Sequence, residues 1–158
     1  MVQAESPVAT DAEIYCEHSV ALIRFATVLV GPDDAPDIVS SAVLRALRSP
    51  GWSGVANHRA YLHQAVANEA RNFNRGQMRR REREASVVQT EIVYPPEAYP
   101  EVLQAVRRLS VRQRAVVYLT YWEDMTDQMT ADYLDISAGS VRRHLARARH
   151  HLRRVLDE

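Results

Sequence analysis

Two clusters of arginine are the side chains best suited to bind a ligand. All 20 basic residues are arginine, and the 20 acidic residues bring the formal net charge to zero. Residues 71–83 hold six arginines and one acid, and residues 142–154 hold six arginines and no acid. Residues 1–37, by contrast, hold seven acids and one arginine. Two basic clusters in a neutral chain predict a polyanion that is bound at two places.

The second cluster lies on a predicted helix with two distinct faces. At about 100° per residue, its apolar side chains share one narrow sector and its arginines occupy the opposite side. A short helix from Thr126 and a turn over 135–137 precede it, which is the form of a helix-turn-helix. We expect its first turns at the base edges of duplex DNA and its later arginines at phosphates. The predicted duplex-binding residues are Ser137, Ser140, Arg142, Arg143 and Arg147. The alternative is an arginine-rich helix that only faces water.

The first cluster ends a predicted helix that carries amides beside its arginines. Arg71, Arg75 and Arg79 recur every four residues, and Asn68 and Asn72 lie on an adjacent face. Arginines, amides and an aromatic loop suit unstacked single-stranded bases better than closed duplex. The predicted single-strand site is Trp52, Asn68, Arg71, Asn72 and Arg75, in which Trp52 occupies a glycine-flanked loop as the stacking candidate. The alternative places the aromatic side chains of this region in the core.

Catalytic and metal-binding patterns are not found in the sequence. The six histidines show no ligand spacing paired with carboxylates, and no glycine-rich phosphate loop occurs. The single cysteine, Cys16, excludes an internal disulfide framework and a multi-cysteine zinc site, and we expect it to be buried. The sequence predicts a protein that is not an enzyme, with no cofactor and no metal.

The elements that position these clusters are all predicted to be helices. Three in the N-terminal half form an antiparallel bundle, and four in the C-terminal half include the helix-turn-helix. The predicted ranges are 11–30, 34–47 and 58–81, then 102–109, 110–122, 126–134 and 137 to near the end. Pro95, Pro96 and Pro100 mark a linker between the halves. We therefore predict an all-α fold with two small helical domains, 1–85 and 101–158, joined by a Pro-containing linker over 86–100.

The composition is that of a globular protein, with 46% apolar and 25% charged residues. No apolar run approaches the roughly 20 residues that a membrane span needs. The acidic N-terminus lacks the basic and apolar stretches of a signal peptide. These features predict a cytoplasmic protein with no membrane span.

The order of these pieces resembles the extracytoplasmic-function (ECF) class of bacterial RNA polymerase sigma factors. The resemblance covers about residues 11–156, and each motif is loose alone, so their order and the linker carry the match. The motifs are Ala35-Pro36-Asp37-Ile38-Val39 with Val43-Leu44-Arg45-Ala46; Tyr61-Leu62, Val66-Ala67-Asn68 and Arg75; Leu109-Ser110, Gln113-Arg114, Val116-Val117, Leu119, Tyr121 and Glu123-Asp124-Met125; and Ile136-Ser137, Gly139-Ser140-Val141, Leu145, Arg147-Ala148 and Leu152.

The resemblance implies a factor that directs promoter-specific transcription initiation. Sigma domain 2 would bind the β′ clamp helices of core RNA polymerase, at the positions of Asp37, Ser40 and Ser41, and melt the minus-ten promoter element. Sigma domain 4 would read the minus-thirty-five element as duplex DNA and touch the β flap. An anti-sigma factor is a further partner that the resemblance implies.

The sequence departs from the family pattern at a few positions. Pro36 and Ser40 stand where Glu and Gln are usual around Asp37, Met129 replaces a Glu, and Asp135 replaces the turn glycine. Two other functions stay open at this point. One is a stand-alone helix-turn-helix regulator that does not engage polymerase. The other is a sigma-like decoy that binds a regulatory protein and does not support initiation.

Overall fold

The computed structural model of the protein describes residues 9–83 and 100–157. Within these ranges the chain forms seven α-helices, one short 3-10 helix and no β-strand, which confirms the all-α prediction. The helices are α1 (Asp11–Val30), α2 (Ala35–Leu47), η1 (Trp52–Gly54), α3 (His58–Arg83), α4 (Pro100–Arg107), α5 (Val111–Tyr121), α6 (Asp127–Leu134) and α7 (Ala138–Leu156). The predicted linker over 86–100 lies outside the described residues, except for Pro100, which begins α4.

Local capping interactions explain where most of these helices begin. Thr10 and Ser110 form reciprocal capping boxes with Glu13 and Gln113, as their spacing predicts. The Thr126 hydroxyl accepts a hydrogen bond from the backbone N–H of Met129 at the start of α6. The capping box is incomplete, because the Met129 side chain has no oxygen to accept a bond from the Thr126 N–H. Asp34 occupies the N-cap position of α2, but its side chain makes no capping hydrogen bond.

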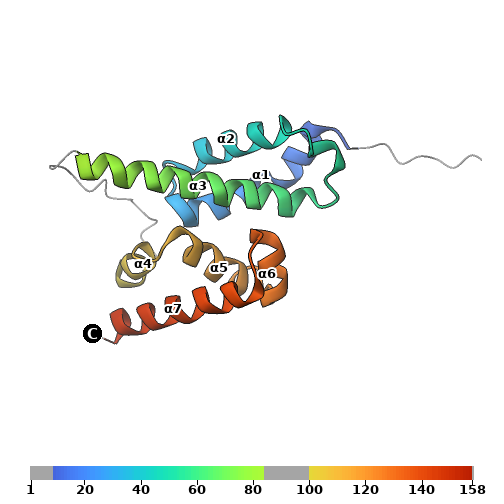
Figure 1. Cartoon of the computed structure of the whole chain (residues 1–158). Coiled ribbons are helices and arrows are strands. Elements are labelled where there is room, and N and C mark those ends of the chain that lie inside the picture. The colour runs from blue at the N-terminus through green and yellow to red at the C-terminus, as the bar shows by residue number, and fades with distance from the viewer. Residues whose placement is uncertain (1–8, 84–99, 158) are drawn as a thin grey trace, which may run out of the picture.

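The N-terminal helices α1, α2 and α3 pack on one another in a three-helix bundle (Figure 1). Each contributes apolar side chains at helical spacing to a shared core. The fully buried members include Leu22, Phe25, Leu29, Val39, Leu62 and Val66. An ion pair of 2.9 Å between Arg45 and Glu69 joins α2 to α3 at the edge of this core. The bundle therefore fixes the position of α3, its longest helix.

The C-terminal helices form a second group in which α7 packs on α4, α5 and α6 (Figure 1). The inner face of α7 consists of Val141, Leu145 and Ala148, all buried. This face agrees with the apolar sector that its sequence predicts. Within the two described ranges, no helix combines the length and the apolar character that a membrane crossing requires.

The two groups of helices also pack against each other. In Figure 1 the C-terminal group lies along α1 and α3, on the side opposite α2. Phe25 of α1 contacts Tyr118 of α5, with ring centroids 5.6 Å apart. His63 of α3 contacts Tyr133 of α6 at 5.2 Å. The sequence predicted two units joined by a linker and gave no indication of this contact, which we call the inter-unit interface.

Phe25 lies at the point where the two groups meet, so its truncation tests whether they share one core. We expect Phe25→Ala to lower the free energy of unfolding by about 3–5 kcal/mol, because it removes a fully buried ring. Val20→Ala on the same helix is the control, since Val20 is 68% exposed and its truncation should change stability by less than about 0.5 kcal/mol. Chemical denaturation of the full chain measures both. A Phe25 effect as small as the Val20 effect would contradict the packing.

Candidate nucleic-acid interface

The turn before α7 is fixed by backbone geometry and by one serine cap. Asp135 adopts a left-handed conformation with φ 51°, which Asp tolerates better than most residues. Ser137 then caps α7: its Oγ accepts a hydrogen bond from the backbone N–H of Ser140 at 3.1 Å. The Ser137 hydroxyl also donates to the Ser140 hydroxyl at 3.0 Å. Both predicted serines are thus brought together at the first turn of α7, where they hold the helix start.

The outer face of α7 presents all of its arginines to solvent. Arg142, Arg143, Arg147, Arg149, Arg153 and Arg154 are exposed. Arg142 lies 3.6 Å from the Asp127 carboxylate of α6, which the single-helix analysis did not predict. The Arg149 guanidinium donates to the Tyr121 hydroxyl at 2.6 Å and stacks over that ring. Among the residues that the structure describes, Arg143 and Arg147 form no ion pair.

Electrostatic repulsion shows how concentrated the positive charge is beside this face. Burial lowers the pKa of His144, and the nearby guanidinium groups of Arg112, Arg147 and Arg143 lower it further. Arg112 also lies near the other predicted cluster. Burial, Arg112 and then Arg75 lower the pKa of Arg71. Arg112 of α5 therefore connects the two arginine clusters, a role that no pattern within either cluster could have indicated.

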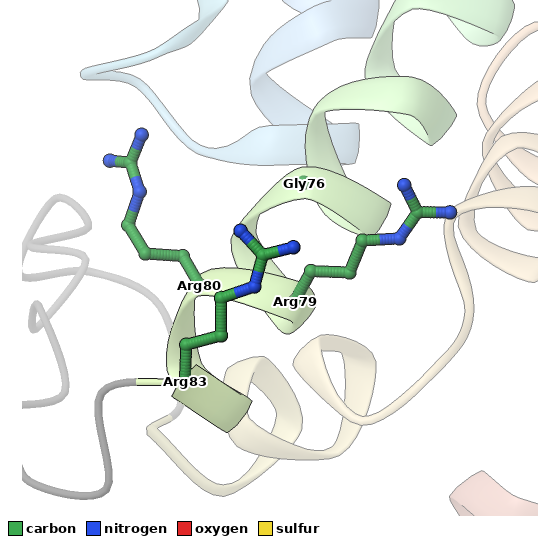
Figure 2. Close-up of a pocket in the computed structure, with 4 residues that line it drawn as sticks. All are labelled: Gly76, Arg79, Arg80 and Arg83. Atoms are coloured by element: carbon green, nitrogen blue, oxygen red, sulfur yellow. The ribbon is translucent and has the colours of Figure 1, made fainter.

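Only some of the side chains of the predicted single-strand site on α3 are exposed, as such a site requires. Asn68, Asn72 and Arg75 are exposed, whereas Arg71 is half-buried beside the C-terminal helices. The helix continues through Gly76 without a break. Near its end, Gly76, Arg79, Arg80 and Arg83 border a hollow of about 410 Å³. Figure 2 shows the three arginine side chains extending in different directions from the last turns of α3.

Trp52 is not the exposed stacking surface that the glycine-flanked loop predicts. Its side chain is 8% exposed and packs against the rings of His58 and Tyr61. The indole Nε1–H donates a 2.7 Å hydrogen bond to the Asp11 carboxylate at the start of α1. The prediction was wrong because the partner that satisfies the indole comes from a distant part of the chain. In this conformation Trp52 joins η1 to α1.

The predicted polymerase-binding residues form an exposed stripe on α2. Asp37, Ser40 and Ser41 are all exposed on α2. This helix lies on the side of the N-terminal bundle away from the C-terminal helices (Figure 1). Leu44 extends the same stripe at the i+7 position and is 52% exposed. Leu44 was not among the residues predicted for this site. The spacing 37, 40, 41 and 44 could have identified it.

Two further observations concern reactive side chains. Cys16 is exposed on α1, so the prediction that it is buried is wrong. Within the described ranges, no group of three or more potential metal-binding side chains comes together. What the geometry offers is therefore a set of exposed guanidinium, amide and hydroxyl groups on α3 and α7.

Comparison with known proteins agrees with this geometry. The family "Sigma-70, region 4" matches residues 100–152. An RNA polymerase sigma-E factor from Streptomyces antibioticus is 32% identical over 169 residues, which cover 98% of this chain and 88% of that protein. An RNA polymerase sigma-E factor from Streptomyces avermitilis is 31% identical over 144 residues, which cover 87% of this chain and 79% of that protein.

Two solved structures share the fold. One is the sigma factor RpoE in complex with the anti-sigma factor NepR from Bartonella quintana, with a TM-score of 0.66 and 22% identity over 90% of this chain and 94% of that chain. The other is CnrH in complex with the cytosolic domain of CnrY, with a TM-score of 0.64 and 22% identity over 93% of this chain and 87% of that chain.

Fold and site together define an all-helical protein with a helix-turn-helix in its C-terminal half. The extent of the sequence match then places it within one family. The chain belongs to the RNA polymerase sigma factors, in the ECF class. The members of this family are transcription initiation factors and not enzymes.

The buried position of Trp52 has an optical signature that can be measured. In a Trp122→Phe variant, Trp52 is the single remaining tryptophan, and we expect blue-shifted emission that acrylamide quenches weakly. The Trp52→Phe variant is the control, because Trp122 is 71% exposed and should emit at longer wavelength with strong quenching. Strong quenching of Trp52 would instead restore the prediction of an exposed stacking ring.

Proposed function

We propose that the chain binds core RNA polymerase and directs it to promoters as an initiation factor with two DNA-binding surfaces. The observation that carries this proposal is the outer face of α7, where exposed arginines follow a serine-capped turn. Residues 1–85 act as sigma domain 2 and residues 101–158 as sigma domain 4. The linker over 86–100 connects the domains and spans the distance between their sites on the polymerase.

The α2 stripe is the proposed contact with the β′ clamp helices of polymerase. Asp37, Ser40, Ser41 and Leu44 are exposed together, and the C-terminal helices pack on the other side of the bundle. A carboxylate, two hydroxyls and one exposed leucine suit a helical surface that offers both cations and apolar side chains. Pro36 lies in the first turn of α2, where a missing N–H costs no hydrogen bond.

The outer side of α3 is the proposed contact with the melted minus-ten element. Asn68 and Asn72 each offer a donor and an acceptor to an unstacked base, and Arg75 is exposed to contact phosphate. Arg71 would complete this surface once the C-terminal helices move away from it. Trp52 has no direct part in the proposal, because its indole is committed to Asp11.

The start of α7 is the proposed reader of the minus-thirty-five element. Ser140 and Arg143 lie in its first two turns, which approach base edges when a helix enters the major groove. Ser137 and Arg142 lie beside them, and Arg147 follows one turn later. The same domain would contact the β flap of polymerase.

An anti-sigma factor is the further partner that we propose. The fold matches a sigma factor that was solved with the anti-sigma factor NepR and CnrH that was solved with the cytosolic domain of CnrY. These matches cover nearly the whole chain, including both groups of helices. A regulator of this chain would accordingly be sought among proteins that bind sigma factors of this fold.

Promoter-specific transcription by the reconstituted holoenzyme tests the proposal. We expect the chain and core polymerase together to give run-off transcripts from a subset of genomic promoter fragments. Asp37→Arg should reduce both polymerase binding and transcription about tenfold or more, which corresponds to a loss of about 1.4 kcal/mol. Asp33→Arg is the matched control, because it reverses an exposed charge just before α2 and outside the stripe.

The two alternatives give different results in the same assay. Sequence-specific duplex binding without any polymerase-dependent transcription would favour a stand-alone regulator. Polymerase binding or regulator binding without transcripts from any fragment would favour a decoy. Equal activity of the Asp37 and Asp33 variants would overturn the clamp assignment only.

Two arginines of α7 separate base recognition from simple charge. Arg143→Ala should cost roughly 1–3 kcal/mol on the preferred promoter and relax the preference at one base step. Arg147→Ala should weaken binding about equally on all sequences and reduce the salt slope by about one unit. Titration of the holoenzyme against duplexes varied in the upstream element, at several salt concentrations, measures both. Identical, sequence-independent losses would mean that α7 contributes charge alone.

A further inference from the structure

The inter-unit interface contains one ionisable ring that is almost completely buried. His63 of α3 is 1% exposed, and its ring lies between Phe25 of α1 and Tyr133 of α6, with both centroid distances 5.2 Å. One of these neighbours belongs to the N-terminal group of helices and the other to the C-terminal group. Separation of the two groups therefore removes Tyr133 from one side of the imidazole and admits water.

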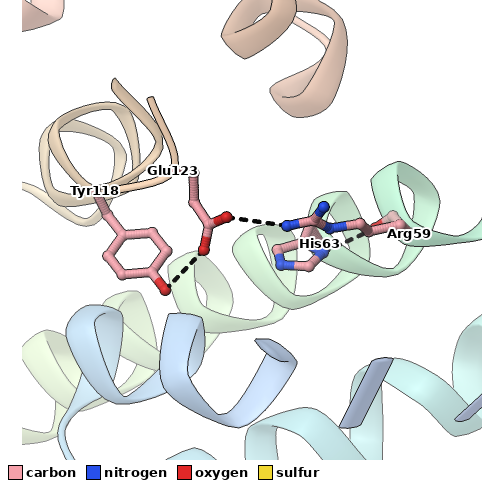
Figure 3. A network of polar contacts seen from close by, with 4 residues as sticks. All are labelled: Arg59, His63, Tyr118 and Glu123. Atoms are coloured by element: carbon pink, nitrogen blue, oxygen red, sulfur yellow. Dashed lines mark hydrogen bonds and ion pairs between the residues drawn. The ribbon is translucent and has the colours of Figure 1, made fainter. Parts of the chain in front are cut away.

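The polar groups around His63 are already engaged with partners in the closed form. Its Nδ1–H donates a 2.8 Å hydrogen bond to the Arg59 carbonyl oxygen, one turn earlier on α3. The Arg59 guanidinium pairs with the Glu123 carboxylate at 2.9 Å, and Glu123 also accepts a 3.1 Å hydrogen bond from the Tyr118 hydroxyl (Figure 3). Glu123 is the one carboxylate near the ring among the described residues, and two donors already engage it.

The groups that face His63 come from every helix packed around it. Arg59 lies on α3, His18 on α1, Tyr118 on α5 and Tyr133 on α6, and Glu123 follows α5. Burial lowers the pKa of His63 from 6.5 to about 4, with smaller contributions from Arg59 and His18 in the same direction. The Arg59 carbonyl and Glu123 act in the opposite direction and do not offset the burial.

We propose that His63 is a pH-dependent switch of the inter-unit interface, in which the neutral ring holds α1 and α3 against α5 and α6 and its protonation releases the C-terminal helices. This proposal does not rest on the proposed function, because it concerns the two groups of helices alone. Its physical basis is the cost of a charged imidazole between two aromatic rings with no free carboxylate to pair with it.

Proton linkage gives the direction and size of the effect. In the open form the ring is hydrated and titrates near its ordinary pKa of 6.5, whereas in the closed form the pKa is about 4. The open form therefore binds more protons between these values, and acidification favours it. From about pH 7.5 to about pH 5 the ratio of open to closed chain should rise roughly 30-fold.

Fluorescence energy transfer across the interface measures this ratio in the full chain. Cys16 is an exposed labelling site on α1, and Gln128→Cys adds an exposed site on α6. We expect the fraction of chains with separated labels to increase on acidification. If the closed form dominates too strongly to be quantified, a fixed sub-denaturing concentration of urea, the same for every variant, brings the ratio into range.

His63→Phe is the decisive variant, because a phenyl ring keeps the apolar contacts and cannot be protonated. We expect its open-to-closed ratio to stay nearly constant over the same pH range. His63→Gln, which keeps a side-chain donor, covers the case in which the Phe variant does not fold at neutral pH. His150→Gln is the histidine control, since His150 is exposed on α7 and this variant should retain the full pH response.

Each outcome of this experiment either supports the proposal or overturns it. A large pH response in the wild type that both His63 variants lose supports the proposal. An equal response in the wild type and a His63 variant would overturn it, and so would a constant ratio in the wild type at a urea concentration where both forms are populated. A chain that is already open at neutral pH would also overturn it.

Discussion

The contact on which the rest of the structure depends is the group of aromatic rings between the two sets of helices. Phe25 touches both His63 and Tyr118, and His63 touches Tyr133, so three rings and one imidazole join four helices. Each ring also belongs to the core of its own group. The same side chains therefore pack within their own group and position the C-terminal helices against the N-terminal ones. Loss of this contact would expose aromatic surface on both sides.

Repulsion between like charges opposes this closed arrangement. Closure brings Arg112 of α5 near Arg71 of α3, and no carboxylate is among the causes that shift the pKa of Arg71. The ion pair between Arg59 and Glu123 lies at the same interface and is favourable, but it is partly exposed and so contributes modestly. Burial of the aromatic rings must therefore supply most of the stability of the closed form. A polyanion bound near Arg71 and Arg112 would reduce the repulsion between them that opposes the closed form.

Much of the fold could be predicted because its determinants are local. The capping residues Thr10, Ser110 and Ser137 each interact within three residues, and the two faces of α7 follow from its helical period. The environments of Trp52 and Arg71, by contrast, depend on distant parts of the chain. The indole of Trp52 is satisfied by Asp11, and the site beside Arg71 is completed by Arg112, so neither environment is encoded near the residue itself. The burial of His63 is likewise not encoded near the residue, since its contacts with Phe25 and Tyr133 come from two other helices.

The placement of α2 has a kinetic consequence for the proposed assembly with polymerase. This helix lies on the side of the N-terminal bundle away from the C-terminal helices, and its stripe is exposed in the closed chain (Figure 1). A partner that recognises this stripe can bind the closed chain directly, so its binding does not require the open form. The observed association rate would then rise linearly with partner concentration, and separation of the helices would follow as a later, concentration-independent step. The chain would in that case follow an induced-fit pathway, because the surface used for capture is not the surface that closure covers.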